Sequence, residues 1–268
     1  MEQSELLKNA WEESDKTQLI GIIREAQGED LGKVFAPEQK KIWDSAFDTE
    51  QKKEKVLICS DERIQPAPGE FKMGVAGQLI LAPLDVQTKF IHDWKGKIKF
   101  VRSHSGCGAA GLAYQKLSPE EKNQYQDGDN PADEYGKLFS ADLASKLGAD
   151  FEHIPFSRMR GSEDFHDARM IFWSADPEFD PSELDNDFLP PHFLANGLAY
   201  GLEPEYCKEE LKILSGIGLG GHGFGELFTP DNPFYVISLG KNAKEINGLA
   251  KEALKEFGDR VKFKYIKR

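Results

Sequence analysis

Two apolar segments that turn abruptly polar constrain the fold of this chain most strongly. The first, KVLICSDERIQP at 55–66, begins as a buried strand and becomes polar at Cys59. The second, KIKFVRSHSGCGAAG at 97–111, changes in the same way at His104. Short apolar runs bounded by turn residues are typical of strands that are buried on both faces, as in a parallel sheet. The pattern therefore predicts an α/β fold.

The segments around these two strands support a mostly parallel sheet flanked by helices. A strand is expected near GQLIL at 77–81, followed by an amphipathic helix at 85–94. A longer helix is predicted between the Asn-Pro start at 130 and the glycine at 148, with another strand at 151–156 directly after it. Strands that alternate with helices indicate parallel pairing.

Three regions are expected along the chain. Helical patterns predict an N-terminal helical arm at 1–50, and both polar turns lie in a core at 51–175. Residues 176–268 are expected to form a C-terminal α/β extension of the same globule, with a strand at PFYVISL (233–239), and another strand is expected at RMIFW (169–173), just before the extension. Its last segment, VKFKYIKR, alternates like an edge strand protected by lysines. No internal repeat is evident in the sequence.

Composition excludes several classes of function. The chain has 268 residues, of which 39% are hydrophobic, and its net charge of −12 repels nucleic acid and anionic membrane surfaces. The N-terminal MEQSELLKNAWEESDK lacks the basic and apolar parts of a signal peptide, and no apolar run approaches a membrane span, so we expect a cytoplasmic protein. Three cysteines in a chain this long indicate reduced thiols or metal ligands rather than a disulfide framework.

The residues that follow the first strand are chemically suited to a site. Alternate residues of a strand project to one side, so Cys59, Asp61 and Arg63 could face one cleft. In open α/β sheets, ligands bind outside the carboxyl ends of the strands. Both polar turns are therefore expected at the edge of the sheet where a ligand would bind.

The second turn has the spacing of a metal site. Two residues separate His104 from Cys107, and Gly106 and Gly108 allow the tight turn that would bring both side chains to one ion. Cys59 is then the candidate third ligand. A Cys₂His set is a known catalytic arrangement of zinc, because the tetrahedral ion keeps a fourth position for water.

Taken together, C-x-D-x-R at 59–63 and H-x-x-C-G at 104–108 resemble the β-class carbonic anhydrases. The resemblance covers roughly residues 55–155 and implies an α/β fold, a homodimer or higher oligomer, and reversible hydration of CO₂ to bicarbonate by zinc-bound hydroxide. It assigns Zn²⁺ to Cys59, His104 and Cys107. It also assigns the acid-base residue that orients zinc-bound water to Asp61, with Arg63 as its partner.

Other functions remain open at this point. The same scaffold acts on CS₂ or COS in relatives, and a noncatalytic zinc-binding or interaction protein would have Asp61 closing the metal site. The loop GIGLGGHGFG at 216–225 contains G-x-G-x-x-G, but Pro230 and Pro233 follow it where a dinucleotide site needs a helix. Cys207 lies in a charged, helical segment and is interpreted as a bystander.

Overall fold

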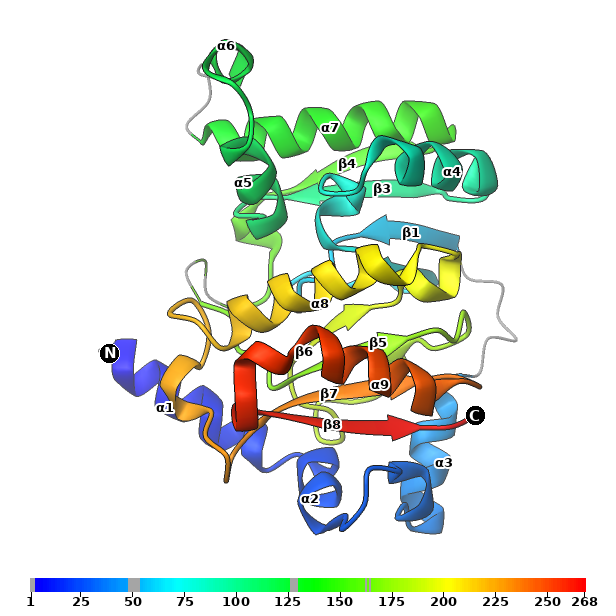
Figure 1. Cartoon of the computed structure of the whole chain (residues 1–268), viewed down its shortest axis with the longest axis vertical. Coiled ribbons are helices and arrows are strands. Elements are labelled where there is room, and N and C mark those ends of the chain that lie inside the picture. The colour runs from blue at the N-terminus through cyan, green and yellow to red at the C-terminus, as the bar shows by residue number, and fades with distance from the viewer. Residues whose placement is uncertain (1–2, 48–53, 126–129, 162, 164) are drawn as a thin grey trace.

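The protein is an α/β structure with two four-stranded sheets, seen in the computed structural model of Figure 1. The structure describes all residues except 1–2, 48–53, 126–129, 162 and 164. The first sheet has the order β2-β1-β3-β4, with β1 (Glu54–Ile58), β2 (Glu70–Gly74), β3 (Phe100–His104) and β4 (Asp150–Ile154). The second has the order β6-β5-β7-β8, with β5 (Met170–Ser174), β6 (His192–Ala195), β7 (Phe234–Leu239) and β8 (Val261–Ile266). All of these pairs are parallel, which confirms the predicted fold class.

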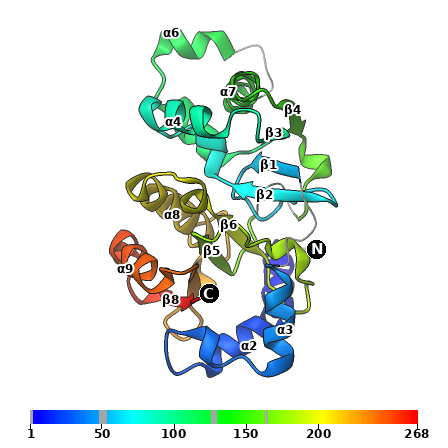
Figure 2. The same cartoon turned by 90° about the vertical axis from the view of Figure 1, so that its right-hand side faces the viewer.

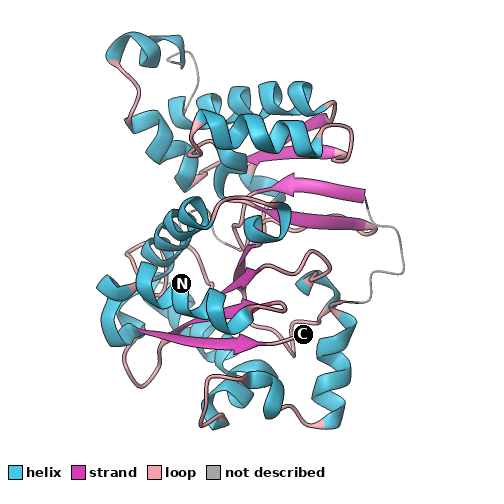
Figure 3. Cartoon of the chain, turned by 45° about the vertical axis from the view of Figure 1, so that its right-hand side comes forward, coloured by secondary structure: helices cyan, strands magenta, loops and turns pink. Residues whose placement is uncertain are grey.

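Helices flank both sheets, and short 3₁₀ turns connect many of the elements (Figure 3). The helices are α1 (Gln3–Asp15), α2 (Gln18–Glu25), α3 (Pro37–Ser45), α4 (Leu84–Trp94), α5 (Gly108–Gln115), α6 (Pro119–Lys122), α7 (Pro131–Leu147), α8 (Pro204–Gly218) and α9 (Ala243–Ala253). The 3₁₀ turns are η1 (Leu31–Lys33), η2 (Ala76–Leu79), η3 (Asn123–Tyr125), η4 (Phe156–Arg158), η5 (Pro181–Glu183), η6 (Gly197–Tyr200), η7 (Gly225–Leu227) and η8 (Lys255–Arg260).

The longest helix, α7, begins and ends as the sequence predicts. The Asn130 side chain accepts hydrogen bonds from the backbone amides of Ala132 and Asp133, which satisfies donors that have no partner inside the helix. Gly148 ends the helix in the left-handed conformation, with φ of +70°. The helix packs on β3 and β4 and so fixes one face of the first sheet.

The second sheet is buried on both faces. Ile171 and Trp173 of β5 face the core that includes residues of α8 and α9, whereas Met170 and Phe172 face the core formed with α2 and α3. Figure 2 shows α8 and α9 on one side of this sheet and the N-terminal helices on the other. The alternation explains why β5 is apolar from Met170 to Trp173, because each of these side chains meets one of two cores.

The two sheets repeat one topology, although the sequence shows no repeat. In each half, the second strand pairs with one side of the first strand, and a helix then leads to the third strand, which pairs with the other side of the first. A helical connection leads from the third strand to the fourth, which pairs with the third at the edge of the sheet. The strand register shows which residues of the two halves are equivalent. The paired residues Val56 and Phe100 of the first half correspond to the paired residues Met170 and Tyr235 of the second. We call residues 54–154 the first half and 170–266 the second half.

The halves join where the edge strands β2 and β6 meet. The Leu194 amide donates to the Ser60 carbonyl at 3.1 Å, and the Asn196 amide donates to the Gly74 carbonyl at 3.1 Å. A Cβ atom at Gly74 would lie 2.1 Å from the Leu194 carbonyl oxygen, so only glycine fits this crossing. Buried residues of both halves form one continuous core.

One expected element is wrong. The strand predicted near 77–81 is η2, and β2 lies earlier, at Glu70–Gly74. Gly77 and Gln78 have φ of +56° and +51°, a backbone conformation that no strand contains. The three predicted regions stay a prediction, and the boundary after residue 50 falls within 48–53, outside the described residues. Within the described part of the chain, no helix is long and apolar enough to cross a membrane.

Candidate metal centre

Two neighbouring strands deliver the three candidate ligands to one point. Cys59 directly follows β1, His104 is the last residue of β3, and Cys107 is the N-cap of α5. Because β1 and β3 pair in parallel, their carboxyl ends lie side by side. The two sulfur atoms and a ring nitrogen lie within 4.8 Å of one another, and all three side chains are buried. The structure therefore brings together the residues that the sequence singled out.

The donor atoms of this cluster fit a metal ion. The Nδ1 of His104 lies 2.9 Å from the Ser105 carbonyl, which leaves Nε2 as the free nitrogen. That Nε2 is buried and has no hydrogen-bond partner among the described residues. Ligand atoms around tetrahedral zinc lie about 3.5–3.8 Å apart, so a small inward movement would suffice. Two sulfurs and an imidazole suit zinc, although the set alone does not identify the metal.

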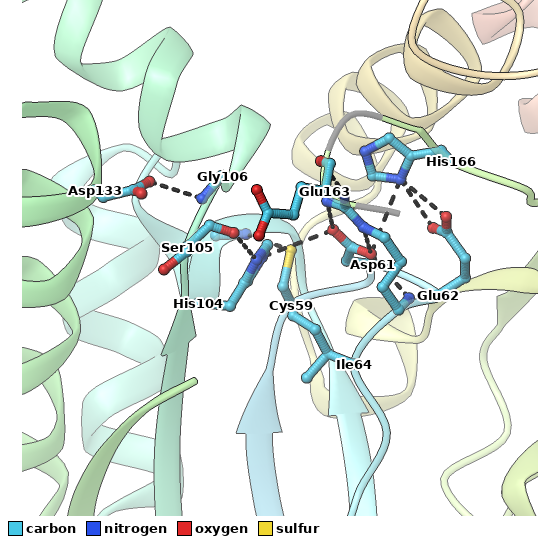
Figure 4. Close-up of polar contacts among 12 residues, drawn as sticks. Cys59, Asp61, Glu62, Ile64, His104, Ser105, Gly106, Asp133, Glu163 and His166 are labelled. Carbon is cyan, nitrogen blue, oxygen red and sulfur yellow. Dashed lines mark hydrogen bonds and ion pairs between the residues drawn. The ribbon is translucent and has the colours of Figure 1, made fainter. Parts of the chain in front are cut away.

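The backbone around the ligands is also adapted to the cluster. The Gly77 amide donates to Cys59 Sγ at 3.4 Å, an interaction that favours the thiolate. A Cβ atom at Gly77 would lie 2.8 Å from that of Ala109, so the close approach requires glycine. Between the other two ligands, the Gly106 amide donates to Asp133 Oδ1 at 2.8 Å and fixes the turn. Figure 4 shows this contact at one side of the site.

Close packing of the three ligands shifts their protonation. The adjacent Cys107 thiol, followed by His104, lowers the pKa of Cys59 well below its usual range. The neighbouring Cys59, together with burial, raises the pKa of Cys107 well above its usual range. Burial alone would lower the pKa of His104, but the neighbouring Cys59 and Asp61 raise it. The short contact between the two thiols therefore favours one thiolate in the pair, and a thiolate is the form that binds metals.

Asp61 and Arg63 form a buried ion pair, and Figure 4 shows Asp61 beside the ligands Cys59 and His104. Arg63 Nη2 donates to Asp61 Oδ2 at 2.8 Å, and Nε donates to Oδ1 at 3.1 Å. Burial would raise the pKa of Asp61, but Arg63, His104 and His166 together lower it far below its ordinary range. Asp61 Oδ2 also lies 3.9 Å from His104 Nε2. An ionised, oriented carboxylate thus stands next to the free ligand nitrogen.

Sequence reasoning missed two neighbours of this pair, Glu62 and His166. His166 Nδ1 lies 2.9 Å from Glu62 Oε1 and 3.9 Å from Asp61 Oδ1. Burial and then the Asp61 charge raise the pKa of Glu62. Asp61, Glu62 and His166 could themselves group around a cation, but the Arg63 guanidinium already occupies both oxygens of Asp61. Glu62 lies inside the C-x-D-x-R motif, between Asp61 and Arg63, whereas nothing in the sequence points to His166.

Sequence reasoning also missed Glu210, which α8 contributes from the second half. Its Oε1 accepts hydrogen bonds of 2.6 Å from Ser60 Oγ and from the Ala76 amide. Burial raises the pKa of Glu210 to about 7, while the bonds from Ser60 and Ala76 oppose that rise. No sequence signal distinguishes this glutamate from its neighbours in EPEYCKEEL, because its partners lie more than 130 residues away.

A cavity of about 800 Å³ lies on the far side of the ion pair. Glu62 and Arg63 line it together with the segment 65–70, Asp167 and His192. Burial, and then the Glu62 charge, raises the pKa of Asp167 to about 7. The cavity thus borders Arg63, whose side chain is itself almost completely buried, and the three candidate ligands do not line it.

The remaining motifs take no part in this site. Gly216 and Gly218 lie in the last turn of α8, and turns follow them instead of a new helix, so the glycine-rich loop lacks the strand-turn-helix context of a dinucleotide site. Cys207 is buried in α8, and burial raises the pKa of its thiol well above the ordinary range. The burial of Cys207 agrees with its interpretation as a bystander, and the loop agrees with the expectation that no dinucleotide site follows it.

The geometry establishes a buried Cys59, His104 and Cys107 group that could bind a metal ion. Comparisons of the chain with protein-family models, with curated proteins and with solved structures found no match. The functional argument therefore depends on the site itself and on the motif resemblance.

Proposed function

We propose that the chain binds zinc through Cys59, His104 and Cys107 and catalyses the reversible hydration of CO₂ to bicarbonate. One observation carries the proposal, namely that two thiols and a ring nitrogen of His104 converge within 4.8 Å beside an ionised carboxylate, while His104 Nε2 is buried without a hydrogen-bond partner among the described residues. Metal ligands alone would suit many functions. The neighbouring Asp61–Arg63 pair is the feature that favours catalysis on water.

The chemistry divides between the ion and the side chains. A zinc ion held by these residues would act as a Lewis acid and lower the pKa of a water at its fourth position to near neutrality. Because the Asp61 carboxylate is ionised, it only accepts hydrogen bonds. It can therefore accept a hydrogen bond from one O–H of that water and so orient the water. Arg63 keeps the carboxylate ionised and in one rotamer. The released proton would pass to solvent.

Two related functions would use the same site. CS₂ or COS could replace CO₂ as the substrate, and release of sulfide would identify that reaction. A noncatalytic zinc protein would need Asp61 as the fourth ligand, but Arg63 engages both carboxylate oxygens. This pairing favours the catalytic proposal over the closed site.

The Asp61→Asn variant tests the assigned role. We expect one zinc per chain to be retained and CO₂ hydration in stopped flow to fall by roughly 10²–10⁴-fold, the usual contribution of a positioned acid-base group. Asp15→Asn is the matched control, because Asp15 also forms a two-point pair with an arginine but lies on α1. Full activity of Asp61→Asn would contradict the proposal, as would sulfide release from COS in place of CO₂ hydration.

A further inference from the structure

The second half reaches into the metal centre through one side chain. Glu210 on α8 is 2% exposed, and its Oε1 accepts hydrogen bonds from Ser60 Oγ and from the Ala76 amide, both at 2.6 Å. Its other oxygen, Oε2, has no hydrogen-bond partner among the described residues. Burial of this carboxyl group costs free energy, because one of its oxygens is unsatisfied. Its presence beside the metal cluster therefore suggests that Glu210 has a role there.

The two donors belong to the two segments that surround Cys59. Ser60 is the next residue in the chain, and Ala76 precedes Gly77, whose amide donates to Cys59 Sγ at 3.4 Å. A single oxygen of Glu210 therefore connects the segment that carries the ligand with the segment that donates to it. Without this acceptor, a buried hydroxyl and a buried amide would both lack a partner.

The second half has no corresponding cluster of its own. The matched strand registers place Trp173, Leu239 and Asn242 at the positions of Cys59, His104 and Cys107. The helix caps support the match, since Cys107 is the N-cap of α5 and Asn242 is the N-cap of α9. None of these three side chains offers a thiol or an imidazole. The second half repeats the fold of the first without its chemistry.

We propose that Glu210 is a positioning residue of the metal centre, and that the second half, which lacks ligands, serves to hold the Cys59 side of the site in the first half. The inference rests on the metal site of the proposed function and deepens it. It makes metal affinity depend on a hydrogen-bond acceptor that lies 151 residues from the first ligand in sequence. Outer partners of this kind typically contribute 10–100-fold to metal affinity.

Two substitutions of Glu210 separate positioning from charge and volume. Glu210→Gln keeps an acceptor oxygen for Ser60 and Ala76, whereas Glu210→Leu removes it at similar size. Titration with Co²⁺, read by the absorption of the cobalt-thiolate protein, should give Glu210→Leu a dissociation constant about 10–100-fold higher and a shifted spectrum. Glu210→Gln should stay within about threefold of the wild type and restore its spectrum. Ser215→Ala is the control, because Ser215 is buried on the same helix and its hydroxyl has no partner among the described residues.

Each outcome is decisive. Wild-type affinity and spectrum in Glu210→Leu would overturn the inference and leave the proposed function standing. Absence of Co²⁺ and Zn²⁺ binding by the wild type would overturn the proposed function and this inference with it. If Glu210→Leu does not fold, Ser60→Ala decides, since it removes one of the two bonds and should weaken Co²⁺ binding and speed hydrogen exchange of the Ala76 amide. Unchanged binding and exchange in Ser60→Ala would contradict the inference.

Discussion

Arg63 binds the carboxylate of Asp61 at both oxygens, at 3.1 Å through Nε and at 2.8 Å through Nη2. The Arg63 backbone amide adds a third bond to Oδ1 at 2.9 Å. Both side chains are almost completely buried, so solvent screens the pair little. The orientation of Asp61 beside the ligand cluster therefore depends on Arg63.

We predict that Arg63→Met converts Asp61 into a metal ligand. Without the guanidinium, the buried carboxylate loses its closest positive charge, and a cation bound beside His104, whose Nε2 lies 3.9 Å from Asp61 Oδ2, would replace that charge. Turnover should fall by at least 10²-fold while metal is retained, and the spectrum of the cobalt protein should change. In Arg63→Met with Asp61→Asn, the spectrum should return to that of the wild type. A spectrum unaffected by Arg63→Met would exclude this response.

Glu210 should make stability depend on pH. Burial raises its pKa from 4.5 to about 7, so the folded chain binds the proton more tightly than the unfolded chain. The stabilisation by this proton is fully present below pH 4.5 and is lost as the pH rises through about 7. Relative to Glu210→Gln, the free energy of unfolding of the wild type should fall by about 3 kcal/mol over that interval. Urea denaturation of both proteins with a chelator present, from pH 4.5 to 8, measures the difference. A difference independent of pH would refute the expectation.

Arg169 should control the attachment of α1. Its guanidinium lies 3.5 Å from the centre of the Trp11 ring and donates to Ser14 Oγ at 2.8 Å, and the side chain is fully buried. Arg169→Met should lower the free energy of unfolding by about 3 kcal/mol and speed amide exchange in α1, because it removes a desolvated cation–π contact and the hydrogen bonds to Ser14 and Asp15. Arg24→Met is the control, since Arg24 binds Asp15 near the surface, and it should cost about 1 kcal/mol or less. Unchanged exchange in α1 of Arg169→Met would contradict this account.

The part of the site that could be predicted is the part encoded locally. Cys59 and His104 follow apolar strand segments, and parallel pairing then brings the ends of those strands together without further information. Glu210 and His166 could not be found, because their contacts with Ser60 and Glu62 cross 150 and 104 residues of sequence. The Glu210 contact depends on how the two halves pack, and the His166 contact depends on how the segment between them packs against the first half.

The repeat was hidden for a related reason. The strand positions shared by β1 and β5 are apolar in both halves, but the residues that carry the site are not repeated, as Cys59 and Trp173 illustrate. Glycine recurs where the geometry demands it, since Gly77 and Gly197 both lie in the 3₁₀ turn after the second strand of their half. The expected strand at 77–81 failed at this turn, because apolar composition suggested a strand and the positive φ angles there forbid one.

The central claim is that Cys59, His104 and Cys107 hold a metal ion, and elemental analysis of tag-free protein tests it most directly. The wild type should contain one zinc per chain, and Cys59→Ser and His104→Ala should lose it. Cys207→Ala should keep it, because Cys207 is an equally buried thiol outside the cluster. Protein without metal, or zinc content that depends on Cys207 and not on Cys59, would contradict the account.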